Sequence, residues 1–157
     1  MLHVLKFQLG RPLAITFLRR NSKAGSVDIM HHLLSKYILE VCMVEYTLAH
    51  IAPSEMAASA LLLSIKLLEP EMQFQTIWKL NLSYYSGYQV GQLLETIQKM
   101  ARIMKDIHTS KFSAAYTKYS SSSNQKVALH VATNTKIHEL LSRLAEGKLL
   151  RSPKIIY

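Results

Sequence analysis

Three cationic side chains in the N-terminal quarter of the chain could converge on one anion. Arg19 is the first of the two arginines that end the stretch PLAITFLRR, and His32 and Lys36 follow in HHLLSKY. His32 and Lys36 are four residues apart, so on a helix they share one face. Two helices packed antiparallel through the connection NSKAG would bring Arg19 beside the first turns of the second helix, where free backbone N–H groups also favour negative charge. The spacing therefore predicts a phosphate-sized site, and a solvated basic edge is the alternative.

Other patterns with known chemistry are missing from the sequence. His31 and His32 are adjacent, so on a helix their side chains point about 100° apart and cannot chelate one metal ion together. The single cysteine, Cys42, lies inside the apolar segment KYILEVCMVEY, which excludes a disulfide or a cysteine-rich zinc site within the chain. The chain has no phosphate-cradling glycine loop, no HExxH and no nucleophile elbow. We therefore expect no enzyme activity, no metal and no cofactor.

The composition fits one folded domain with an uneven basic charge. The chain has 157 residues, 49% of them apolar, and a formal net charge of +9. Residues 1–36 carry six basic and one acidic side chain, residues 37–98 two and six, and residues 99–157 eleven and three. This distribution of charge favours binding of nucleic acid or of a phosphorylated partner by the two basic ends. The alternative interpretation is that the lysines only keep the exposed helix faces solvated.

The hydrophobic segments predict a protein without a membrane anchor. The longest apolar run, MAASALLLSIKLL from Met56 to Leu68, contains two serines and a lysine and is too short to span a bilayer. The first residues, MLHVLKFQLGRP, lack the apolar core and cleavage site of a signal peptide. We expect a soluble protein in a reducing, intracellular compartment.

Apolar residues recur at spacings of three and four along most of the chain, which predicts an all-α domain. Pro12 suits the first turn of a helix that ends at the paired arginines, Arg19 and Arg20. Ser26 is expected to cap a second helix that reaches Leu48. Pro53 is expected to open the third helix, which is apolar nearly all round and therefore central.

The second half of the sequence predicts three further helices. Glu69 precedes a proline, which ends the third helix. A long amphipathic helix is expected from Tyr88 to Ile107, and a shorter one in KFSAAYTKY. The segment KVALHVA alternates with period two but has no partner strand, so it is expected to be extended or irregular. TKIHELLSRLAEG is expected to form the last helix, with Gly147 as its C-terminal cap.

The first half of the chain resembles a known family. VLKFQLGRPLAITFLRR, then HHLLSKYILEVCMVEY and APSEMAASALLLSIKLL, resemble in order and spacing the second, C-terminal cyclin-box domain of animal B-type mitotic cyclins. The similarity runs from about Val4 to Leu144. It implies an all-α, five-helix cyclin fold with a buried central helix, SEMAASALLLSIKLL, and an additional C-terminal helix.

The resemblance also implies a function. Cyclins are non-catalytic regulatory subunits that bind and activate a cyclin-dependent protein kinase, in this subfamily at the G2/M transition, in nucleus and cytoplasm. B-type cyclins hold a phosphorylated serine or threonine of a partner with the arginine of FLRR and with the histidine and lysine of H-x-x-x-K. In this chain those positions are Arg19, His32 and Lys36.

The resemblance further implies a domain plan. Nothing in the chain resembles the first cyclin box of the family, which carries the main kinase contacts, or the destruction box. Residues 1–11 would then be a linker from a missing N-terminal cyclin box, residues 12–146 the C-terminal cyclin-box domain and residues 147–157 a tail. The kinase would be bound mainly through the absent first box.

A second interpretation uses the basic ends differently. Cyclin-like folds also occur in transcription factors that bind DNA, so the chain could be a basic helical module that binds nucleic acid in transcription. The basic residues of the later helices alternate with apolar core positions instead of forming one stripe, which disfavours nucleic acid.

Overall fold

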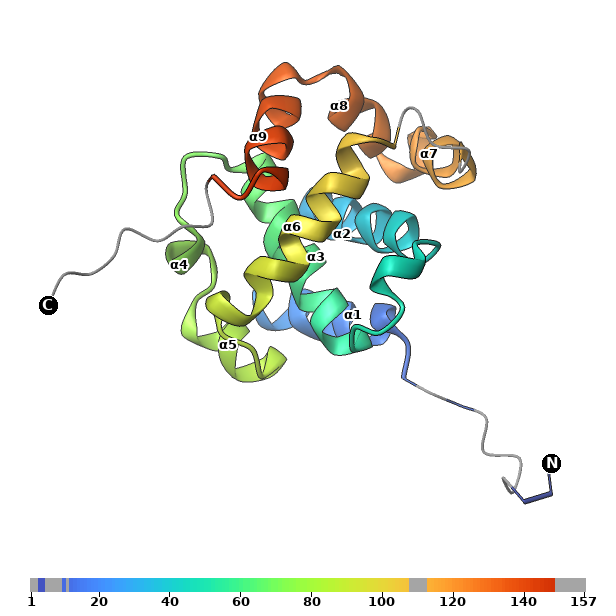
Figure 1. Cartoon of the computed structure of the whole chain (residues 1–157), viewed down its shortest axis with the longest axis vertical. Coiled ribbons are helices and arrows are strands. Elements are labelled where there is room, and N and C mark those ends of the chain that lie inside the picture. Colours follow the sequence, from blue (N-terminus) through green and yellow to red (C-terminus); the bar gives the residue numbers. More distant parts are fainter. Residues whose placement is uncertain (1–2, 5–9, 11, 108–112, 149–157) are drawn as a thin grey trace, which may run out of the picture.

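A computed structural model describes residues 3–4, 10, 12–107 and 113–148 of the chain, and within these ranges the regular structure is entirely helical. Figure 1 shows the arrangement of the helices. In chain order the elements are α1 (Ala14–Ala24), α2 (Ile29–Cys42), η1 (Tyr46–Leu48), α3 (Pro53–Leu68), α4 (Phe74–Ile77), α5 (Leu80–Ser86), α6 (Val90–Lys105), α7 (Ser113–Tyr119), η2 (Ser122–Asn124), α8 (Val127–Thr133) and α9 (Thr135–Ala145).

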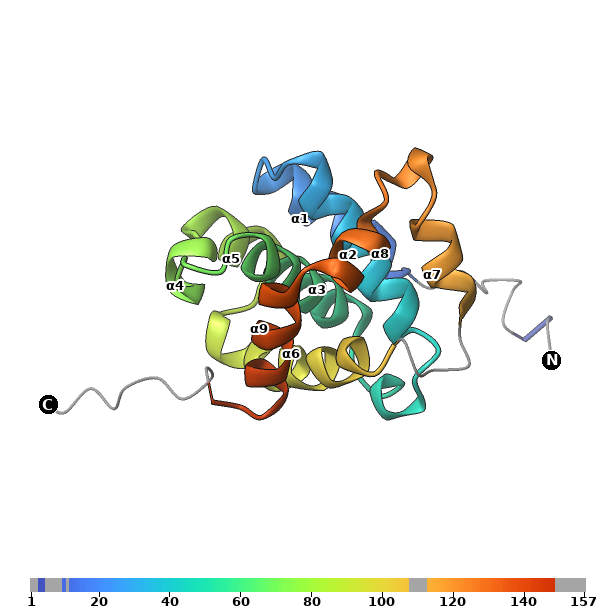
Figure 2. The same cartoon turned by 90° about the horizontal axis from the view of Figure 1, so that it is seen from above.

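Helix α3 occupies the centre of the domain. Every residue from Met56 to Leu67 is buried, because the helix is apolar on all sides and is covered on all sides. It packs against α1, α2 and α6, as Figures 1 and 2 show. The small residues Ala57, Ala58 and Ala60 let these neighbours approach closely. The prediction of a buried central helix is confirmed.

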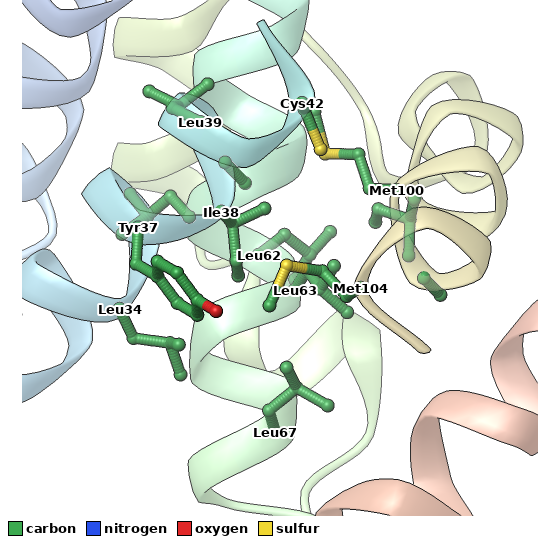
Figure 3. Close-up of a cluster of buried hydrophobic side chains, with 14 of the residues drawn as sticks. Leu34, Tyr37, Ile38, Leu39, Cys42, Leu62, Leu63, Leu67, Met100 and Met104 are labelled. Atoms are coloured by element: carbon green, nitrogen blue, oxygen red, sulfur yellow. The ribbon is translucent and has the colours of Figure 1, made fainter. Parts of the chain in front are cut away.

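The core forms where α2, α3 and α6 meet. Figure 3 shows side chains from the three helices pointing toward one another. Burial of this apolar surface is the main stabilising contribution to the fold. The labelled members of the cluster are Leu34, Tyr37, Ile38, Leu39 and Cys42 from α2, Leu62, Leu63 and Leu67 from α3, and Met100 and Met104 from α6.

The buried side chain of Lys66 closes the C-terminal end of α3. Its Nζ donates to the carbonyl oxygens of Pro70 and Met72, each at 2.6 Å, and lies 5.6 Å from the ring centroid of Phe74. Only 7% of the residue is exposed. The ammonium therefore fixes the turn between α3 and α4, because it satisfies carbonyl groups that no helix satisfies.

Replacing Lys66 with methionine is expected to destabilise the domain. Methionine keeps the apolar stem but leaves two carbonyl oxygens without their donor, which costs about 1–3 kcal/mol of the free energy of unfolding. Urea denaturation followed by circular dichroism measures the loss. Lys136→Met, at an exposed position of α9, serves as the control and should change stability by less than about 0.5 kcal/mol. Equal stability of both variants would contradict this role of Lys66.

The turn between α1 and α2 differs from its prediction. Helix α1 begins at Ala14 and continues one turn past Arg20 to Ala24. The cap of α2 is Asp28, whose carboxylate accepts the backbone N–H of Met30 at 3.3 Å. Ser26 instead lies in the turn itself, with a left-handed φ of 49°. The spacing rule missed this boundary because polar residues of a helix end and of a turn look alike in sequence.

Helix α2 is shorter than predicted. It ends at Cys42, and Glu45 takes an extended conformation before the 3-10 turn η1. Leu48 is nevertheless buried, at 2% exposure, whereas Val44 is 52% exposed. The apolar spacing that predicted a helix up to Leu48 therefore continues through the 3-10 turn η1. Residues three apart lie on one side of a 3-10 turn, as residues three or four apart do in an α-helix.

The prediction of an extended or irregular segment at KVALHVA is wrong. Residues Val127–Thr133 form α8, and the buried side chains are Val127, Ala128 and Val131. Positions i, i+1 and i+4 belong to one helical face, while Leu129, which alternation would bury, is 37% exposed. The buried side chains therefore match the four-residue spacing of a helix and not the two-residue alternation of an extended segment.

The end of α9 agrees with its prediction. Gly147 has a left-handed φ of 73°, its N–H donates to the carbonyl of Leu144 at 3.0 Å, and the N–H of Lys148 donates to the carbonyl of Arg143 at 3.1 Å. These two bonds form a Schellman motif, in which glycine is favoured because it lacks a Cβ.

Some predictions fall outside the described residues. They include most of the 1–11 linker, the tail beyond residue 148, and the first two residues of KFSAAYTKY, whose helix α7 is described from Ser113. None of the helices in the described ranges combines the length and the apolar character that a membrane crossing requires.

Candidate functional site

Helices α1 and α2 present the three predicted cationic residues. Arg19 lies in the middle of α1 with its side chain exposed. The sequence predicts that Arg19 lies near the end of this helix. In the structure α1 continues to Ala24, so Arg19 is not at its end. His32 and Lys36 lie on successive turns of α2, and both are half-buried. Their common face follows from the four-residue spacing.

A hydrogen bond from α1 orients the imidazole of His32. The hydroxyl of Ser22 lies 2.8 Å from Nδ1 of His32, and Ser22 is 9% exposed. This contact occupies one ring nitrogen and leaves Nε2 as the second polar atom of the ring. The bond also ties the first turn of α2 to the last turns of α1.

The three residues interact electrostatically. Burial is the largest cause that lowers the pKa of His32, and the positive charges of Lys36 and then Arg19 lower it further. His32 and Lys36 share one face of α2, and the positive charge of Arg19 in α1 acts on the imidazole although Arg19 and His32 are 13 positions apart in sequence. An anion at this place would relieve the repulsion among them.

Ser22 is a site residue that the sequence prediction missed. The prediction ended the first helix at Arg20, so Ser22 was assigned to the connection. Apolar spacing does not mark this continuation of the helix, because Asn21 and Ser22 are polar, and only the structure shows that they are buried beside Leu18. Ser22 also lies three residues after Arg19, which places both on neighbouring parts of one helical surface.

The adjacent histidine, His31, faces a different neighbour. Its Nε2 lies 3.2 Å from Oε1 of Glu69, at the end of α3. His32 contacts α1 through Ser22, as described above. The two imidazoles therefore contact neighbours on different sides of α2, as expected for adjacent residues of a helix, which point about 100° apart.

Comparison with known proteins defines the class. A family model described as the cyclin C-terminal domain matches residues 12–133. The chain belongs to this family, and its central buried α3 and all-helical architecture agree with the fold that the sequence predicted.

Within the family the chain is similar to mitotic cyclins. It is 42% identical over 145 residues to the G2/mitotic-specific cyclin-B of Marthasterias glacialis, which covers 92% of this chain and 36% of that protein. It is 42% identical over 147 residues to the G2/mitotic-specific cyclin-B2 of Macaca fascicularis, with coverage of 92% and 36%. The corresponding cyclin-B of Spisula solidissima is 44% identical over 129 residues, with coverage of 80% and 29%. The resemblance to B-type cyclins is confirmed, and the chain spans about a third of the length of these relatives.

Proposed function

We propose that the chain acts as the C-terminal half of a B-type mitotic cyclin. In this role it is a non-catalytic regulatory subunit that supports binding and activation of a cyclin-dependent protein kinase at the G2/M transition. The family match over residues 12–133 and the identity to G2/mitotic-specific cyclins support the proposal. They favour it over the alternative of a nucleic-acid-binding module.

The second part of the proposal concerns phosphorylated regulatory proteins. Arg19, His32 and Lys36 would donate hydrogen bonds to the oxygens of a phosphoserine or phosphothreonine, and Arg19 can do so with two N–H groups. The observation that carries this part is the orientation of the His32 ring by Ser22 on the α2 face that also holds Lys36, and the charges of Lys36 and Arg19 acting on that ring support it. No bond is made or broken at such a site, so it recognises a modification without catalysis.

The domain plan and the location belong to the same proposal. Residues 12–146 would form the cyclin-box domain, with 1–11 as a linker from an N-terminal cyclin box and 147–157 as a tail. A fragment of residues 12–146 should unfold cooperatively in urea, and a fragment without a cooperative transition would contradict the plan. The protein would act in nucleus and cytoplasm, and exclusion of a fluorescent fusion from both would contradict that location.

A pair of peptide libraries tests the phosphate site. One library is degenerate around a central phosphoserine, and the other has serine at the same position. We expect fluorescence anisotropy to show binding of the phosphorylated library only. Equal binding of both libraries would refute the site. Tighter binding of duplex DNA than of the phosphorylated library, with a steep loss as salt rises, would favour the nucleic-acid alternative.

The pH dependence of phosphopeptide binding is a further prediction. The pKa of His32 is lowered in the free protein, and a phosphate dianion beside the ring would raise it, because opposite charge favours the imidazolium. Binding therefore takes up a proton, so affinity rises as the pH falls through the pKa of the complex. Between pH 8.0 and 6.5, where phosphate stays mostly dianionic, we expect a gain of about three-fold.

The variant His32→Gln is the control for this pH profile. Glutamine can donate to phosphate but does not titrate, so its affinity should stay level between the same two pH values. Calorimetry in two buffers of different ionisation enthalpy measures the proton uptake directly. A wild-type affinity that rises with pH would show that His32 does not face the phosphate.

A further inference from the structure

Helix α7 binds the acidic residue that shares a face of α2 with the candidate phosphate site. Glu40 lies four residues after Lys36 and eight after His32, so the three side chains lie on one face of α2. Helix α7 packs against α2 (Figures 1 and 2). The Nζ of Lys118 lies 2.5 Å from Oε1 of Glu40, and the hydroxyl of Tyr119 donates to the same oxygen at 2.9 Å. Two residues of α7 therefore hold this carboxylate.

The two residues of α7 have different roles in this contact. Tyr119 is fully buried, and the centroid of its ring lies 5.3 Å from that of Tyr37 in α2. Burial, and then the hydrogen bond to Glu40, raise the pKa of Tyr119, so its hydroxyl keeps its proton and donates it to the hydrogen bond. A neutral hydroxyl orients the carboxylate but does not compensate its charge. The compensating positive charge comes from Lys118.

Without Lys118, the carboxylate of Glu40 would have another cation within reach. A lysine and a glutamate four residues apart on a helix can form an ion pair. Lys36 takes part in no ion pair within the described part of the chain, because Glu40 is bound by α7 instead. A carboxylate beside the ammonium of Lys36 would offset its positive field and so weaken its attraction for an anion.

We propose that Lys118 is a positioning residue for the candidate phosphate site. It binds Glu40 from α7 and thereby leaves the charge of Lys36 to the phosphorylated partner of the proposed function, on which this inference rests. Lys118 acts through Glu40 and Lys36, and it need not touch the phosphate. The ion pair is partly exposed, with 54% of the Lys118 side chain and 34% of the Glu40 side chain accessible. Its removal therefore leaves no fully buried charge in the fold.

NMR titration of His32 in the full chain tests the inference without a ligand. Repulsion by Lys36 lowers the pKa of His32 after burial does, so a Glu40 carboxylate that turns to Lys36 should raise it. We expect a raised pKa of His32 in Lys118→Met and the wild-type pKa in Lys118→Arg, which keeps the ion pair. In a Glu40→Gln background, Lys118→Met should leave the pKa of His32 unchanged, because Lys118 acts through Glu40. An equal rise in both backgrounds, or no rise in either, would overturn the proposal.

Affinity for the phosphorylated library at pH 8.0 is the second readout. Lys118→Met should weaken binding by about two-fold, which corresponds to one competing ion pair on a helix. Lys136→Met changes the net charge equally at an exposed position of α9 and should bind like the wild type. Unchanged affinity in Lys118→Met, beside a wild type that binds only the phosphorylated library, would overturn the role of Lys118. A wild type that binds both libraries equally would overturn the proposed phosphate site itself, and this role with it, even where the His32 titration behaves as expected.

Discussion

Replacing Arg19 with glutamate is expected to abolish binding of the phosphorylated library while leaving the helical circular dichroism unchanged. The side chain of Arg19 is exposed on α1 and takes no part in the core, so the fold does not require it. The substitution removes a bidentate donor and places a negative charge beside the phosphate. Loss of charge-assisted hydrogen bonds at about 1.5–3 kcal/mol, together with this repulsion, predicts a loss of affinity of at least about 100-fold.

The neighbouring residue provides a matched control for this experiment. Arg20→Glu changes the net charge by the same amount on the same helix, but Arg20 packs over the ring of Phe17, 5.4 Å from its centroid. Its affinity for the phosphorylated library should fall by less than about ten-fold, as expected for a general change in surface potential. Equal losses in both variants would mean that net charge, not a defined site, holds the phosphate.

The largest effect on stability is expected from Leu62→Ala in α3. Leu62 is fully buried where α2, α3 and α6 meet (Figure 3). Truncation removes its contacts and leaves a cavity that the surrounding helices cannot fill completely. Such changes cost about 2–5 kcal/mol, which is a large part of the stability of a domain of this size. Urea denaturation, monitored by circular dichroism, is the measurement.

A substitution of a surface leucine is the control for this prediction. Leu80, in α5, is 84% exposed, so Leu80→Ala should change the free energy of unfolding by less than about 0.5 kcal/mol. Comparison of two identical substitutions separates burial from residue type. If Leu62→Ala were as stable as Leu80→Ala, the central position of α3 would be wrong.

The sequence predicted best those helices whose apolar pattern is compatible with only one conformation and one position in the fold. The third helix is apolar on all sides, so it had to be central, and Pro53 and Pro70 define its ends. The fourth predicted helix, α6, has a strong apolar face and was also placed correctly, with a capping box formed by Gln89 and Gln92. In both helices local preference and burial agree.

The wrong secondary-structure predictions fall where several backbone conformations would bury the same side chains. Leu48 reaches the core through a 3-10 turn instead of a continuous helix, and Val127 and Val131 do so through α8 instead of an extended or irregular segment. In each case periodicity identified buried positions but not the path of the backbone between them. Contacts distant in sequence decide that path, as where α8 packs against α2.

The candidate site remains a prediction in its residues, and its surroundings were not predicted. Arg19, His32 and Lys36 follow from spacing and resemblance, and the structure adds that the charges of Lys36 and Arg19 both act on His32. The hydroxyl of Ser22 depends on the exact length of α1, which the sequence did not reveal.

Capture of a mitotic cyclin-dependent kinase tests the proposed cyclin function most directly. The chain is prepared alone and fused behind the first cyclin box of a B-type cyclin, and each form is immobilised and incubated with the kinase. We expect capture and activation of the kinase by the fusion only, because this chain supports a contact made mainly by the first box. A folded fusion that neither captures nor activates the kinase would contradict the cyclin function, and capture by the chain alone would contradict its supporting role.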